Sequence, residues 1–553
     1  MRRWLWVLAL LAPVLPAQEK VDLSAIHRIR TEAFEGSKVM DHMFYLTDVH
    51  GPRLTGAPGF QAAGDWAVGR LKEWGLDSAV QEKWGPFGRG WSSTRVSVHL
   101  LEPQYGPLIA VPLSWSPGTG GPIQGEPMLA VLPAGPQRQG GAAAGPRPES
   151  PDGPGGGPGA AGAADAELNR FIERYKGKLK GKILMISQPR PLEPQTTAAS
   201  QRFNETTLAA QALAPPPGRA AARRPFDDQA TRRRNNKRNQ FLRDEGVLGV
   251  VQMPFRGDGG TIFAGSFGSR HPDDPPSPPA IALASEHYNR IARLLEKKVP
   301  VRLEIDVQAK FHDQSLDSFN VVGEIPGGDK KHEVVMLGAH LDSYSAGTGA
   351  TDNAAGSAVV MEAMRVLKTL NLKMDRTVRL ALWSGEEQGL LGSRAYVKQH
   401  FGDRETMALK PEHAKLAGYF NIDNGTGKIR GVYLQNNDMM RPIFEAWFAP
   451  FQDLGVSTIT IRTTGGTDHL SFDAVGLPGF QFIQDAVEYE SRTHHSNMDV
   501  YDRIQASDLM QASAVLASMV YHAATRPEML PRKPLPKPQP RRPEERKPAT
   551  TGS

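Results

Sequence analysis

The sequence predicts an α/β fold with a mostly parallel central sheet flanked by helices, and a second, small α/β domain inserted into it. Two observations carry this prediction. Between residues 311 and 525, continuous apolar strands alternate with helices, which is typical of a parallel sheet that is covered on both faces. Between residues 111 and 310, short apolar runs are separated by Gly/Pro-rich and Arg-rich stretches. With 553 residues, 39% hydrophobic and 22% charged, the chain can fill more than one domain core.

The chain starts with a segment typical of a secretory signal peptide at residues 1–17. Met-Arg-Arg is followed by the apolar run 4–15 and then by Pro16 and Ala17. An uncleaved anchor is the alternative, but about 20 apolar residues are needed to cross a bilayer, and Pro13 and Pro16 interrupt this run. We therefore expect an exported protein, secreted or periplasmic, without a membrane span.

Residues 21–110 are expected to form the N-terminal part of the main domain, with helices over 24–75 and a strand over 95–101. Residues 111–310 are expected to form the small domain. Its predicted elements are the apolar runs 128–132, 182–187, 246–252 and 279–283, the amphipathic helix 285–296 and the strand 301–307.

Residues 311–525 are expected to form the rest of the main domain. Its predicted strands are 334–338, 377–383, 418–422, 458–462 and 479–483, and its predicted helices are 354–370, 390–400, 439–450 and 506–523. In such a sheet a functional site lies beyond the carboxyl ends of the strands.

Three stretches are expected to be poorly ordered: the Gly/Ala/Pro-rich residues 134–164, the Arg-rich residues 214–240 and the Pro-rich basic tail 526–553. The leader, the Arg-rich stretch and the tail together carry +13, although the whole chain carries only +6, so the remainder is acidic at −7. The basic stretches have no interleaved aromatic residues for base stacking, so a nucleic-acid partner is not expected.

Residues that can bind a metal ion follow the predicted strands. They are His340, Asp342, Asp352, Glu386, Glu387, Asp423, His494 and His495. Each has an ordinary structural explanation when taken singly, because Asp352 could cap a helix and Glu386 and Glu387 could be acids of a first helical turn. Together, at one edge of one sheet and in a chain without cysteine, they suit zinc or another divalent transition ion.

The number of candidate ligands favours two ions over one. A catalytic zinc ion has three protein ligands and water, so five ligands are too many for one open site. Two ions that share a carboxylate can hold a water between them and lower its pKa, which leaves one acid over as a general base.

Five segments of the chain resemble peptidase family M28, the co-catalytic zinc peptidases. They are GAHLDSYSAGTGATDNAAGSAVVMEAMRVL (338–367), LALWSGEEQGLLGSRAYV (380–397), FNIDN (420–424), GGTDHLSFDAVGLP (465–478) and HHSNMDVYDRI (494–504). The resemblance implies a zinc-exopeptidase-like (phosphorylase/hydrolase-like) fold. Residues 111–310 resemble a protease-associated (PA) domain through PAIALASEHYNRIARLLEKK and VRLEIDV.

The resemblance also implies roles for residues of this chain. His340 and Asp423 would bind the first zinc ion, Glu387 and His495 the second, and Asp352 both. His495 is chosen over His494 because the phrase His-Ser-Asn-Met-Asp fits the family when read from 495. Glu386 would be the general base, Asp342 would orient His340, and Asp468 would contact substrate or orient the site.

These roles imply a dinuclear zinc exopeptidase that acts on peptides, with an aminopeptidase as the first choice. A carboxypeptidase or dipeptidase of the same family is an alternative. Two further classes stay open: a glutaminyl-cyclase-like acyl transferase with one zinc ion, and a non-catalytic, receptor-like binding protein. The oligomeric state and the preferred side chain are not predicted.

Overall fold

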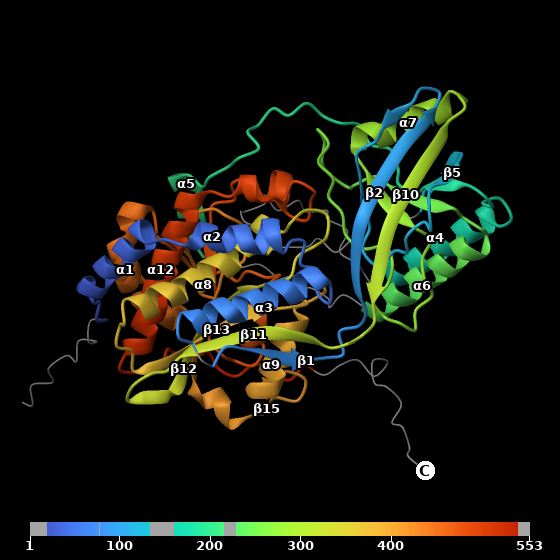
Figure 1. The fold of residues 1–553 in the computed structure, drawn as a ribbon. Coiled ribbons are helices and arrows are strands. Elements are labelled where there is room, and N and C mark those ends of the chain that lie inside the picture. Colours follow the sequence, from blue (N-terminus) through green and yellow to red (C-terminus); the bar gives the residue numbers. More distant parts are fainter. Residues whose placement is uncertain (1–18, 77, 133–159, 215–227, 540–553) are drawn as a thin grey trace, which may run out of the picture.

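The computed structural model describes residues 19–76, 78–132, 160–214 and 228–539, so the predicted leader lies outside the described residues. Two units are seen in Figure 1: a larger one built on a broad sheet, and a smaller one that carries the long ribbon of β2 and β10. Within the described ranges, no helix combines the length and the hydropathy that a membrane crossing requires.

The larger unit contains an eight-stranded sheet in the order β1-β11-β13-β12-β16-β19-β17-β18. Four of its seven neighbouring pairs are parallel, including the three central pairs of β13, β12, β16 and β19. The sheet is therefore mostly parallel at its centre, as predicted. Its strands are β1 (Val80–Trp84), β11 (Ser318–Ile325), β12 (Lys330–His340), β13 (Arg376–Trp383), β16 (Leu416–Asn421), β17 (Ile429–Tyr433), β18 (Thr458–Thr460) and β19 (Gly479–Gln484).

Both faces of this sheet are buried, and side chains alternate between two cores. In β12, Val335, Leu337 and Ala339 face one core while Val334 and Met336 face the other. This explains why the central strands read as unbroken apolar runs. The first core includes α1 (Leu23–Glu35), α2 (Val39–Phe44), α3 (Pro58–Glu73), α8 (Ala355–Thr369), α10 (Arg441–Phe448) and α12 (Ala506–Thr525), and the second includes α9 (Leu391–His400) and α11 (His469–Asp473).

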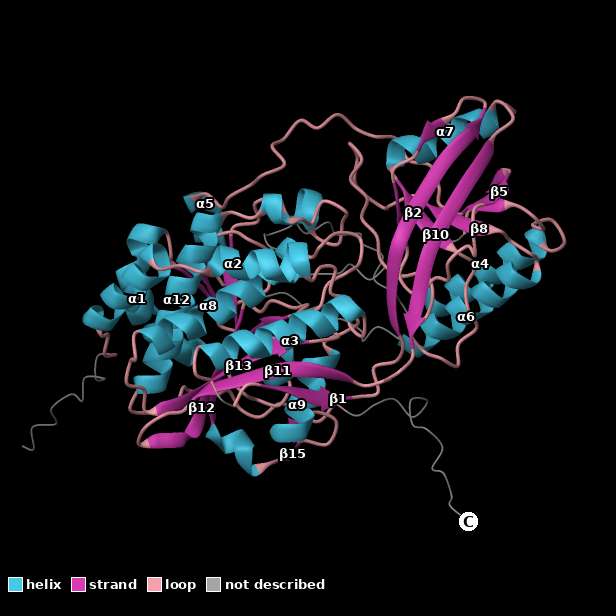
Figure 2. Ribbon diagram, in the orientation of Figure 1, coloured by secondary structure: helices cyan, strands magenta, loops and turns pink. Residues whose placement is uncertain are grey.

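The smaller unit contains a four-stranded sheet, β3-β2-β10-β5, and a five-stranded sheet, β4-β9-β8-β7-β6. In Figure 2, β2 and β10 form its long ribbon, and α4 and α6 lie side by side at its outer edge. The elements are β2 (Gly90–Glu102), β3 (Gly106–Pro107), β4 (Ala110–Pro112), β5 (Ile123–Gly125), β6 (Pro127–Leu129), α4 (Ala160–Tyr175), β7 (Ile183–Met185), α6 (Asp228–Asp244), β8 (Gly249–Gln252), β9 (Ala280–Leu283), α7 (Ser285–Glu296) and β10 (Arg302–His312).

The structure differs from the expected domain limits at two places. Strand β2 pairs with β10 from Gly90 to Glu102, so this strand lies with the smaller unit and not with the N-terminal part of the larger one. Residues 199–213 instead return to the larger unit, where Gln201 pairs with Val487 and α5 (Glu205–Ala212) contacts β18. Local apolar patterns did not reveal either pairing because the partner is distant in sequence.

Parts of the stretches expected to be poorly ordered have regular contacts. Residues 228–240 lie in α6, where Arg232 and Asn236 bind the buried carboxylate of Asp274, and residues 160–164 begin α4. Residues 526–539 of the tail run along the larger unit, with Leu530 buried in its core. Residues 133–159, 215–227 and 540–553 lie outside the described residues.

One buried acid in the larger unit makes stability depend on pH. Glu362 on α8 is fully buried and accepts hydrogen bonds from His42, Arg365 and the main-chain N–H of Lys38. Burial raises the pKa of Glu362, but the hydrogen bonds from His42 and Arg365 prevail and lower it to about 2. A depressed pKa stabilises the fold above the ordinary value of a glutamate, and this stabilisation is lost as the pH falls towards 2.

We therefore expect Glu362→Gln to destabilise the protein by about 3 kcal/mol at pH 6. More than half of this difference in the free energy of unfolding should disappear at pH 3, because the charged carboxylate of Glu362 then stabilises the folded state much less. Denaturant unfolding of both proteins at the two pH values measures it, with the exposed Glu296→Gln as a control. An equal difference at both pH values would show that the charge of Glu362 does not matter.

Candidate metal centre

The carboxyl ends of the central strands meet at one edge of the large sheet. The register pairs His340 at the end of β12 with Trp383 of β13, and Gly338 with Asn421 of β16. Glu386 and Glu387 follow β13 by three and four residues, and Asp423 follows β16 by two. These residues therefore lie at the sheet edge where the sequence placed them.

The first group of side chains surrounds His340. Its Nε2 lies 3.2 Å from Asp352 Oδ1, 3.3 Å from Asp423 Oδ1 and 4.0 Å from Glu386 Oε2. All four side chains are buried. His340, Glu386 and Asp423 offer three ligand atoms within 4.8 Å of one another, and so do His340, Asp352 and Glu387.

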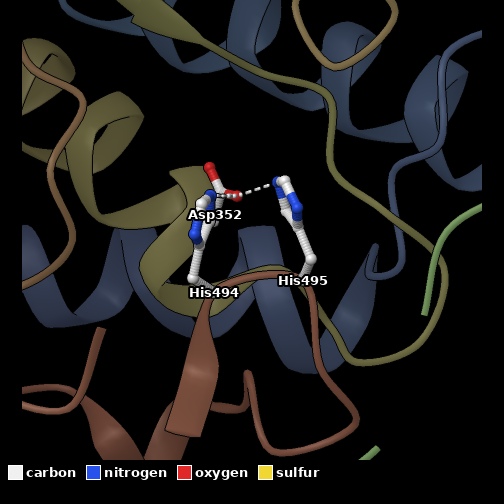
Figure 3. Close-up of side chains that lie close together, drawn as sticks. All are labelled: Asp352, His494 and His495. Atoms are coloured by element: carbon white, nitrogen blue, oxygen red, sulfur yellow. Dashed lines mark ion pairs between the residues drawn. The ribbon is translucent and has the colours of Figure 1, made fainter. Parts of the chain in front are cut away.

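The second group lies on the other side of Asp352. Nε2 of His495 is 3.0 Å from Asp352 Oδ2 and 3.0 Å from Glu387 Oε2. The two oxygens of Asp352 therefore face two different imidazoles, His340 and His495. Figure 3 shows His494 and His495 side by side, both directed at Asp352, but His494 Nε2 is farther away, at 3.6 Å from Oδ2.

His340 is oriented by the residue two positions later in the chain. Its Nδ1 lies 2.9 Å from the main-chain carbonyl oxygen of Asp342 and 3.5 Å from the nearer carboxylate oxygen. The main-chain carbonyl is thus the closer acceptor, whereas the sequence suggested the carboxylate. A proton held on Nδ1 leaves Nε2 free as an acceptor or a metal ligand. The carboxylate of Asp342 instead accepts from Thr55 Oγ1 and from the main-chain N–H of Glu386.

Several carboxylates are buried close together around the two histidines. Burial raises the pKa of Glu387 to about 8, with a further contribution from Asp352, and burial with nearby acids raises the pKa of Glu386 well above its usual range although His340 opposes it. Glu387 Oε1 and Asp352 Oδ2 accept no hydrogen bond of normal geometry from the described residues. In a tetrahedral zinc site, the ligand atoms lie about 3.3 Å from one another and form no hydrogen bonds among themselves. The separations between the histidine nitrogens and the carboxylate oxygens here are similar. This donor set therefore fits metal ions.

Asp468 lies close to this centre but below its surface. Its side chain is fully buried, and neither carboxylate oxygen has a hydrogen-bond partner of normal geometry among the described residues. Burial raises its pKa to about 7. The structure thus places Asp468 as a buried acid near the proposed ligands, and its role, substrate contact or orientation of the site, stays a prediction.

Three residues without a predicted role support the metal centre. The buried guanidinium of Arg53 donates to the carbonyl oxygens of Leu46, Leu341, Thr348 and Gly349 and so ties the N-terminal segment to the loop after β12. Asp499 accepts from the main-chain N–H of Thr351 and Asp352. Tyr344 packs its ring 4.3 Å from that of His495. Asp499 closes the quoted phrase His-Ser-Asn-Met-Asp and could have been found there, whereas Arg53 and Tyr344 had no comparable signal.

A small pocket of about 10 Å³, enough for roughly one water molecule, lies beside the second group of side chains. It is lined by Tyr344, Gly347, Gly349, Asp352, His495, Ser496 and Asp499. Glycine is required at 347, since a Cβ there would lie 2.6 Å from the carbonyl oxygen of Ser496. The loop after β12 and the loop that carries His495 therefore pack closely against each other at the site.

Comparison with known proteins shows which family and which relatives this chain resembles. Residues 320–520 match the model of peptidase family M28. Carboxypeptidase Q of Bos taurus is 31% identical over 257 residues, which cover 46% of this chain and 52% of that protein. The chain thus spans about half the length of the curated relatives it matches.

Two solved structures share the fold. The peptidase M28 precursor from Shewanella amazonensis SB2B has a TM-score of 0.62 at 23% identity, and the alignment covers 93% of this chain and 98% of that one. BSAP, a zinc aminopeptidase from Bacillus subtilis, has a TM-score of 0.51 at 18% identity, with 88% and 94% covered. Through residues 320–520, the chain is similar to peptidase family M28.

Proposed function

We propose that this protein is a zinc-dependent exopeptidase with two metal ions in one site. The observation that carries the proposal is the buried carboxylate of Asp352, with one oxygen facing His340 and the other facing His495. His340 and Asp423 would hold the first ion, Glu387 and His495 the second, and Asp352 both. When bound, the zinc ions would polarise the scissile carbonyl and lower the pKa of the attacking water.

Glu386 would carry the proton during hydrolysis. It is the member of the first group that is farthest from His340. Burial, and after it the neighbouring acids, raise its pKa, so its carboxylate is suited to accept a proton. It would take a proton from water as the water oxygen attacks the carbonyl carbon. The same proton would then go to the leaving nitrogen as the C–N bond breaks.

Removal of an amino-terminal residue is the first choice of activity, because an acidic site favours a substrate with a free ammonium group. The arginines near the site are engaged: Arg53 by main-chain carbonyls and Arg256 by Glu490 at 3.2 Å. The second candidate is a carboxypeptidase or dipeptidase, which the similarity to carboxypeptidase Q favours.

A panel of aminoacyl-anilides, N-blocked peptides and dipeptides, tested with and without a chelator, separates these activities. We expect hydrolysis of aminoacyl-anilides, no hydrolysis of N-blocked peptides, and loss of activity on chelation that zinc restores. Cleavage of N-blocked peptides at their C-terminus would favour the second candidate. Pyroglutamate formed from an N-terminal Gln peptide, or no turnover by the zinc-loaded protein, would contradict peptidase action.

A further inference from the structure

The loop that carries His495 is bonded to the smaller unit as well as to the large sheet. The main-chain N–H of Ala264 donates to the carbonyl oxygen of His495 at 3.0 Å, and Phe263 forms a bridge with Ser496. Ile262 is fully buried in a core of the smaller unit, so residues 260–264 are a firm support for this loop.

The side chain of Asn497 forms two hydrogen bonds between the two segments. Its Oδ1 accepts from the main-chain N–H of Ile262 at 2.7 Å, and its Nδ2 donates to the carbonyl oxygen of Gly260 at 3.1 Å. Its own main-chain N–H donates to the carbonyl oxygen of Ile262. One residue, two positions after His495, thus joins the loop to the smaller unit through three hydrogen bonds.

The two histidines at the centre are oriented by different means. His340 Nδ1 is held by the carbonyl oxygen of Asp342, whereas the recorded polar side-chain contacts of His495 are made by its Nε2, with Asp352 and Glu387. His495 also has a φ of 63°, in the left-handed region that residues other than glycine rarely adopt. The main-chain path of its loop, together with the Tyr344 ring, must therefore place this imidazole.

We propose that Asn497 is a positioning residue, through which the smaller unit holds His495 at the second metal position. This inference rests on the proposed two-metal site. The inference gives the smaller unit a role in metal binding. It also makes the binding of the two ions depend on different contacts: the first ion is held by residues at the edge of the large sheet, and the second depends on a contact between the units.

The test is stepwise zinc binding by the metal-free full-length protein, measured by competition with a chromophoric chelator. In Asn497→Ala we expect unchanged affinity for the first ion and affinity weakened about tenfold or more for the second. Asn497→Asp, which keeps the acceptor for Ile262, should lie between this variant and the wild type. The matched control is Asn236→Ala, which removes a half-buried asparagine bonded to Asp274 elsewhere in the smaller unit.

Thermal unfolding of each variant shows whether it is folded. If folded Asn497→Ala or Asn497→Asp binds both zinc ions with unchanged affinity, the inference is overturned. It is also overturned if the affinities for the two ions fall equally. Uptake of a single ion by the wild type would overturn the two-metal proposal itself, together with this inference. Failure of the inference alone is distinguishable, because the wild type then still binds two ions.

Discussion

Replacing Glu386 by glutamine is expected to lower kcat by about three orders of magnitude while both metal ions remain bound. Glutamine has nearly the same shape but cannot accept a proton from the attacking water. In the proposed assignment Glu386 is not a ligand, and its carboxylate lies 4.0 Å from His340 Nε2, so the five ligands keep their positions. KM should change little, because the lost interaction belongs to the transition state.

Steady-state kinetics on the best substrate of the panel, together with zinc content by atomic spectroscopy, measure this result. The control is Glu445→Gln, an exposed glutamate on α10 away from the site. A zinc-replete Glu386→Gln protein with near wild-type turnover would remove Glu386 from the role of base. Loss of one zinc ion would instead show that Glu386 is a ligand.

Replacing Asp352 by asparagine is expected to weaken the binding of both zinc ions and to abolish measurable activity. The amide keeps one acceptor oxygen, so it cannot offer an oxygen towards His340 and another towards His495. The substitution also removes one negative charge from the group of buried carboxylates. We expect the two bound ions of the wild type to fall to fewer than one at zinc concentrations that saturate the wild type.

The control for this change is Asp274→Asn, another buried aspartate, which binds Arg232 and Asn236 in the smaller unit. It should keep the full metal content. If Asp352→Asn loses one ion and binds the other with unchanged affinity, Asp352 is a ligand of a single ion and the bridging role is wrong.

Much of the candidate site could be predicted because of how parallel sheets are built. His340, Glu386, Glu387 and Asp423 follow apolar strands that are easy to find, and the carboxyl ends of neighbouring parallel strands lie at one edge. Asp352 follows the same strand as His340. The match to the family model and the shared fold rest on these same segments. The residue roles and the number of ions stay predictions.

The sequence alone offered little ground to choose between His494 and His495 as the metal ligand. Adjacent histidines have the same chemistry, and only the quoted phrase favoured the second. In the structure His495 contacts both Asp352 and Glu387 at 3.0 Å, while His494 lies against Tyr489 with its Nε2 at 3.6 Å from Asp352. The backbone of the loop, which is held from outside, decides which ring approaches the carboxylates.

By itself, the sequence determined the class of fold, the order of the central strands along the chain and the chemical types gathered at their ends. These features depend on apolar periodicity and on residue identity, which are local. Only the tertiary structure decided which main-chain oxygen orients His340, that Asp468 is fully buried, and that Asn497 joins the His495 loop to residues 260–262. These contacts join segments whose meeting depends on the packing of whole units, and no local pattern records that packing.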